Sequence, residues 1–152
     1  MSTEVEVLPR AAAVPSWAAL VARLPAKLRG PLVGRRHGTT VRVADHEPVV
    51  GPGTMTDLFL GEEMVSAVWL RDTPETLELN IESLADEYPL PPGVVDGWRL
   101  LGHRLTVAAR PNGVWAPVVR ALAGLVDGVI LVEPDWLPVK PGLYTADSLP
   151  HL

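Results

Sequence analysis

The stretch of sequence that decides the fold is residues 104–133, RLTVAARPNGVWAPVVRALAGLVDGVILVE. Two segments of it, 104–110 and 129–133, are rich in aliphatic residues, which predicts strands. Between them, residues 111–113 (Pro-Asn-Gly) predict a turn, and the amphipathic segment 115–126 predicts a helix. The stretch therefore predicts a β-α-β unit.

The N-terminal end of the chain predicts a similar unit. Polar and apolar residues alternate over 4–8, which indicates a short strand. Apolar residues at spacings of three and four from Trp17 to Leu24 predict a helix, which Pro25 should end or kink. β-branched residues at 39–43 predict the next strand. Both helices begin on a Trp, which an ancient duplication and a chance similarity of two Ala-rich helices explain equally well.

The middle of the chain predicts a meander of three strands, at residues 54–60, 64–70 and 76–83. In the third segment, apolar residues alternate with Glu and Asn. A strand with this pattern buries its apolar face and presents its acids to solvent. A short helix is expected at 94–101, ended by Gly102.

Together these segments predict one α+β domain over residues 1–152. We expect a mixed or antiparallel sheet with helices packed mainly on one face, in which two β-α-β-like ends flank a central β-meander. This arrangement has the general style of ferredoxin-like split β-α-β domains. Residues 134–152 carry four prolines and should form an extended tail that packs on the domain.

The composition excludes several classes of protein. The chain has no Cys, which excludes disulfides, Cys-based zinc sites, iron-sulfur clusters and a thiol nucleophile, and fits a reducing cytoplasm. The N-terminus has no signal-peptide pattern, and no apolar run approaches the roughly 20 residues that a bilayer needs. A net charge of −5 argues against a nucleic-acid partner. We therefore expect a cytoplasmic protein without membrane segments or cofactors.

The charge is unevenly distributed along the chain. Residues 1–44 carry seven bases and two acids, residues 45–98 carry one base and twelve acids, and residues 99–152 carry five bases and four acids. The acidic block can be neutralised by the basic first third or lie at ordinary solvated positions. Alternatively, it forms a recognition face for a basic partner, because clustered charges speed association and select partners.

The leading hypothesis is a non-enzymatic binding protein that recognises a basic protein through an acidic face, in the way that small bacterial immunity or antitoxin proteins do. That comparison rests on charge and size alone. A Trp in the Pro-rich loop adds a candidate interface anchor, unless it packs in the tail. The predicted partner-binding residues are Glu62, Glu63, Asp72, Glu75, Glu78, Glu82, Asp86, Glu87 and Trp136.

Two alternatives remain open. Arg35, Arg36 and His37 precede a glycine and could form an anion pocket, which would make the chain a small-molecule anion-binding domain or enzyme. The same three residues could also lie in a solvated loop. In the second alternative the chain is an adaptor subunit of a larger assembly, with its Pro-rich tail as docking strand. No serine-hydrolase elbow, phosphate-binding glycine loop or metal-ligating His spacing occurs, so no catalytic, cofactor or metal site is predicted.

Overall fold

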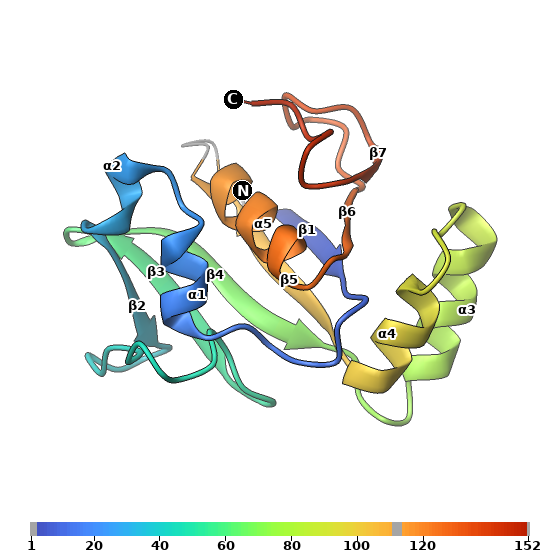
Figure 1. Ribbon diagram of the computed structural model, residues 1–152, viewed down its shortest axis with the longest axis horizontal. Coiled ribbons are helices and arrows are strands. Elements are labelled where there is room, and N and C mark those ends of the chain that lie inside the picture. Colours follow the sequence, from blue (N-terminus) through green and yellow to red (C-terminus); the bar gives the residue numbers. More distant parts are fainter. Residues whose placement is uncertain (1–2, 111–113, 152) are drawn as a thin grey trace.

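The computed structural model describes residues 3–110 and 114–151 and places their strands in one sheet (Figure 1). The strands are β1 (Thr3–Leu8), β2 (Leu32–Arg36), β3 (Met55–Leu60), β4 (Glu63–Arg71), β5 (Arg104–Ala109), β6 (Val129–Val132) and β7 (Gly142–Tyr144). The helices are α1 (Trp17–Ala22), α2 (Ala26–Arg29), α3 (Leu77–Glu87), α4 (Val94–Leu101) and α5 (Trp115–Leu125). The architecture is α+β, as predicted.

The sheet is antiparallel, with strand order β2-β3-β4-β5-β1-β6-β7. β1 lies between β5 and β6 and runs antiparallel to both, so β5 and β6 run in the same direction. Val5 marks the register, since it lies opposite Val107 on β5 and Val132 on β6. The β-α-β unit predicted at 104–133 is therefore present, with the N-terminal strand inserted between its two strands. The turn predicted at 111–113 lies outside the described residues.

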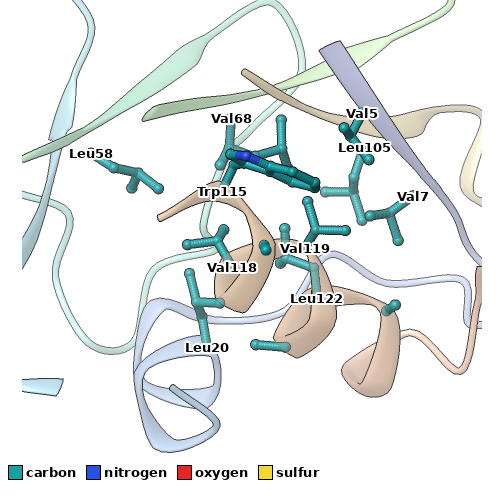
Figure 2. Close-up of a cluster of buried hydrophobic side chains, with 14 of the residues drawn as sticks. Val5, Val7, Leu20, Leu58, Val68, Leu105, Trp115, Val118, Val119 and Leu122 are labelled. Carbon is teal, nitrogen blue, oxygen red and sulfur yellow. The ribbon is translucent and has the colours of Figure 1, made fainter. Parts of the chain in front are cut away.

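The larger core lies between the sheet and helices α1 and α5 (Figure 2). Trp115, Val119 and Leu122 share one side of α5 and are at most 1% exposed. Full burial of such a side chain contributes about 1.5–3 kcal/mol to stability. Trp17, at the start of α1, is 6% exposed, so the Trp that begins each of these two helices lies in the core.

Helices cover both faces of the sheet, whereas the sequence predicted helices mainly on one face. The alternation of β6 shows this, because Ile130 and Val132 belong to the larger core. Val129 and Leu131 point to the opposite face, into a second cluster formed with α3 and α4. Figure 1 shows these two helices side by side, set apart from α1 and α5.

The strand predicted at residues 76–83 is wrong, because this segment is helix α3. A two-residue alternation and a helical repeat both fit its first six residues. The burial pattern distinguishes the two, because Ile81 and Leu84, at helical spacing, are buried, whereas Leu79 is 68% exposed. The segment is also rich in Leu and Glu, which are good helix formers. The acids of this segment therefore lie on a helix and not on a sheet face.

The strand predicted at residues 39–43 is also wrong. The strand of this region is β2, at 32–36, and Gly38 at φ 75° turns the chain back beside it. The returning segment contacts β2 through an isolated bridge between Arg35 and Arg42. The meander is therefore β2-β3-β4, and β5 lies beside β4 in the sheet although α3 and α4 separate the two strands in the chain.

The described part of the C-terminal segment packs against the sheet and helices. Leu137, Val139 and Leu149 are buried in the larger core, and β7 pairs with β6 at the edge of the sheet. These residues are thus part of the folded core and sheet. Among the described residues, no helix combines the length and apolar character needed to cross a bilayer.

Candidate functional site

The acids in and just before α3 are exposed, and together they are called the acidic α3 surface: Glu75, Glu78, Glu82, Asp86 and Glu87. Three of them are four residues apart on the helix and so lie on one side of it. Among the described residues, Glu78 is the member with an ion pair, at 2.8 Å to Arg99 on α4. This bond to the guanidinium lowers the pKa of Glu78.

The basic first third of the chain does not neutralise this surface. Within the described ranges, the acids of the middle block that pair with cationic or titratable side chains of the first third are Glu47, with Arg36, and Asp57, with His37. Neither acid lies on α3. The net negative charge of α3 therefore faces solvent.

The remaining predicted partner-binding acids are not on this surface. Glu62 lies in the turn between β3 and β4 and Glu63 is the first residue of β4, whereas α3 follows the other end of β4. β4 has nine residues, so the two ends lie about 26 Å apart at ~3.3 Å per residue. The structure thus divides the predicted acidic face into two separate regions.

Asp72 is a buried structural residue, which corrects its prediction as a partner-binding residue. Its side chain is fully buried, and its carboxylate accepts hydrogen bonds from Asn80 Nδ2 (2.6 Å) and Trp98 Nε1 (2.7 Å). Arg104 Nε lies 3.4 Å from the same carboxylate. Asp72 therefore joins α3 and α4 to the end of β4 and to β5. Its turn-like sequence context gave no sign of these distant partners.

Glu6 belongs to the same network and was not singled out by the sequence. Thr106 donates a hydrogen bond to it at 2.7 Å, and Arg71 and Arg104 approach its carboxylate at 3.3 and 3.9 Å. Burial raises the pKa of Glu6, against the effect of these partners. The alternation of β1 indicates a solvent-facing position for Glu6, and the packing on that face of the sheet is what buries it.

Two leucines at the surface add apolar contact points to the α3-α4 pair. Leu79 is 68% exposed and Leu100 is 74% exposed. Each follows by one residue a partner of the Glu78–Arg99 ion pair, so both lie close to the acidic surface. The strand alternation assumed from the sequence placed Leu79 in the core, and the helical repeat would have found it exposed.

Trp136 lies at the surface, 43% exposed, in the connection between β6 and β7. Tyr88, the residue that follows α3, packs in the second cluster with Leu131 of β6 and Leu143 of β7, the two strands that this connection joins. The exposed Trp thus follows a segment that approaches the acidic α3 surface.

The predicted anion cluster does not converge on one point. Arg36 donates to Thr56 Oγ1 at 2.9 Å and pairs with Glu47. Arg35 lies over the Phe59 ring at 4.7 Å, and His37 Nδ1 is 2.9 Å from Asp57. Successive residues of β2 point to opposite faces of the sheet. The two arginines are therefore separated and each is already partnered.

The described residues contain no group of three or more His, Asp or Glu side chains arranged to hold a metal ion. Comparison with protein-family models, with curated proteins and with solved structures finds no match for this chain. The acidic α3 surface thus combines exposed carboxylates with two exposed leucines, Leu79 and Leu100.

Proposed function

We propose that this chain is a non-enzymatic binding protein that recognises a basic protein through the acidic α3 surface. The observation that carries the proposal is that four of the five carboxylates on this surface have no cationic partner among the described residues. Like charges gathered on one helix repel each other, so they reduce stability. A basic partner would turn this repulsion into attraction.

The anchoring of α3 supports this proposal. Ile81 and Leu84 bury one side of the helix, and the Asp72 carboxylate holds Asn80 of α3 and Trp98 of α4. A partner would therefore meet carboxylates that are already in place, and binding would cost little ordering of this helix. Leu79 and Leu100 would supply the apolar part of the contact.

The narrower form of the proposal is that the chain neutralises a basic toxin-like protein in the bacterial cytoplasm, as immunity and antitoxin proteins do. Its support is the small size, the net charge of −5 and the concentration of that charge at one region. Tight neutralisation requires fast association, which an acidic surface of this kind promotes toward a basic target.

Affinity capture with matched variants tests the proposal. The α3-neutral variant combines Glu75→Gln, Glu82→Gln and Asp86→Asn, and the control removes the same number of charges elsewhere with Glu62→Gln, Glu63→Gln and Asp127→Asn. A specific partner should be captured from a lysate of the source organism by the wild type and by the control, but not by the α3-neutral variant. It should also be lost between 0.1 and 1 M salt.

Two results would contradict the proposal. The first is a set of captured proteins that is the same for the wild type and the α3-neutral variant. The second is a partner retained equally at both salt concentrations. The narrower form would additionally fail if the purified partner binds but its own activity is unchanged in the complex.

A further inference from the structure

A second charged region lies on the other face of the sheet, where α1, α2, α5 and the C-terminal segment meet. It is a pocket of about 430 Å³, and four basic side chains line it: Arg23, Arg29, Arg120 and His151. These residues come from four separate parts of the chain. We call this region the basic pocket.

The arginines of the basic pocket lack carboxylate partners. Within the described residues none of the three forms an ion pair. Arg29 donates from Nε to the Leu24 carbonyl at 2.8 Å, and Arg120 donates from Nη2 to two carbonyls of the C-terminal segment. Asp147 is the acid in the lining, and it is exposed. The pocket therefore holds a net positive charge.

Arg120 contributes a buried donor that is not satisfied by the described part of the chain. Its Nε is inaccessible to solvent and has no acceptor there. Burial lowers the pKa of this guanidinium, and no carboxylate of the described residues pairs with it. An anion in the pocket would supply a charge opposite to that of this guanidinium.

Gly124 on α5 makes room for the Arg23 side chain. A Cβ at this position would lie 2.8 Å from Arg23 Nη1. Glycine is a poor residue for a helix interior, and at this position it leaves the space that the Arg23 guanidinium occupies. The helix thus accommodates a third arginine at the same pocket.

The chemistry of the lining defines the class of ligand. Guanidinium groups match the oxygens of phosphate, and three of them suit a dianion with three terminal oxygens. Pro25, Pro117 and Ala121 add an apolar wall, and the volume lies in the range of small-molecule sites. We propose that the basic pocket binds a small phosphate monoester, with the phosphoryl group on the arginines and the organic group against this wall. This site is separate from the acidic α3 surface and does not depend on the proposed function.

Isothermal titration calorimetry with phenyl phosphate and inorganic phosphate tests the proposal at constant ionic strength. Phenyl phosphate should bind with one-to-one stoichiometry and several-fold more tightly than phosphate, because it also contacts the apolar wall. Arg23→Gln and Arg29→Gln should each weaken it about tenfold or more. Lys27→Gln is the matched control, since Lys27 lies on α2 but not in the lining, and it should change the Kd less than twofold.

Two further variants separate binding from folding. Gly124→Ala should raise the melting temperature, because alanine favours the helix. The same variant should weaken the binding of phenyl phosphate, because the added Cβ displaces Arg23. Asp147→Asn should strengthen binding, because it removes the negative charge of the lining. The proposal is overturned if the wild type shows no saturable binding of either probe. It is equally overturned if Lys27→Gln weakens binding as much as Arg23→Gln, since the effect would then be one of overall charge.

Discussion

The acidic α3 surface and the basic pocket lie on opposite faces of one sheet and are built in opposite ways. The acidic surface is local in sequence, with its five carboxylates within thirteen residues of one another. The basic pocket gathers Arg23, Arg29, Arg120 and His151 from positions up to 128 residues apart. The first is visible in a charge count along the chain, whereas the second exists only because α5 and the C-terminal segment pack beside α1 and α2.

The difference also concerns what lies beneath the charges. The acidic α3 surface is an exposed layer on a helix whose other side is held by apolar packing and by the Asp72 network. In the basic pocket the charged groups themselves contact the backbone, since Arg120 binds the carbonyls of Leu149 and Pro150. Charge and structure can thus be altered separately on α3 but not at Arg120.

The largest expected effect is on the link between α3 and the sheet. Asp72→Ala removes the acceptor of Asn80 and Trp98 and leaves Arg104 without its nearer carboxylate, which should cost about 3–5 kcal/mol of unfolding free energy. Urea denaturation measures this loss. Asp127→Ala is the control, because Asp127 also has a positive φ but its side chain is 84% exposed. Equal losses in both variants would show that the backbone conformation, and not the network, determines the cost.

A smaller effect distinguishes the two sides of α3. Leu84→Ala should lower the unfolding free energy by about 2–4 kcal/mol, because Leu84 is buried in the second cluster. Leu79→Ala should change it by less than about 0.5 kcal/mol, because Leu79 is exposed. Thermal or urea unfolding of both variants tests the helix directly. A strand in this segment would bury Leu79 and make its replacement the costly one.

A still smaller effect, of the opposite sign, is expected from the charges of α3. Glu82 lies four residues from both Glu78 and Asp86, so Glu82→Gln should raise stability by about 0.2–0.5 kcal/mol for each relieved repulsion. The same variant should lower the affinity for the basic partner. Such an opposition between binding and stability is typical of functional sites. Glu62→Gln, in the β3–β4 turn, should have neither effect. A loss of stability in Glu82→Gln would contradict the picture of an unpaired acidic surface.

The pH dependence of stability should distinguish an acid of α3 from the buried acid Glu6. The Arg99 bond lowers the pKa of Glu78 below its ordinary value of 4.5, so Glu78 adds stability above that pH and loses it as the pH falls through its folded pKa. Burial raises the pKa of Glu6, so its contribution is present below pH 4.5 and is lost as the pH rises through its folded pKa. The free energy of unfolding should be measured across the acid pH range for the wild type and for both variants. Glu78→Gln should remove a contribution that rises with pH, and Glu6→Gln should remove one that falls with pH. Slopes of the same sign would contradict these directions.

The parts of the fold that could be predicted are those with one consistent local pattern. In residues 104–133, the apolar pattern of each segment fits only one type of element, strand or helix. The buried residues of these elements follow the same pattern. Residues 76–83 carry two patterns at once, and the choice between strand and helix depends on which leucines meet the second cluster. That choice requires the positions of Leu8 and Leu131, which are far away in the chain.

The candidate site divides in the same way. Exposed acids such as Glu82 and Asp86 could be expected from the charge block, since the nearest bases in sequence are few. Asp72 belongs to the same acidic block, but its partners Trp98 and Arg104 are set by tertiary packing. Arg35 and Arg36 of the predicted anion cluster are adjacent on β2, and adjacent residues of a strand point to opposite faces of the sheet. Their side chains are therefore separated in space.

The sequence by itself determined the α+β class, the β-α-β unit at 104–133 and the presence of a strongly acidic middle block, because each depends on residues that are neighbours in the chain. Only the tertiary structure decided that the block lies on a helix, that Asp72 is buried beneath it and that Arg23, Arg29 and Arg120 share a pocket. The physical reason is that burial and charge pairing depend on contacts between distant segments. These contacts arise only when β1 inserts between β5 and β6 and brings both ends of the chain together.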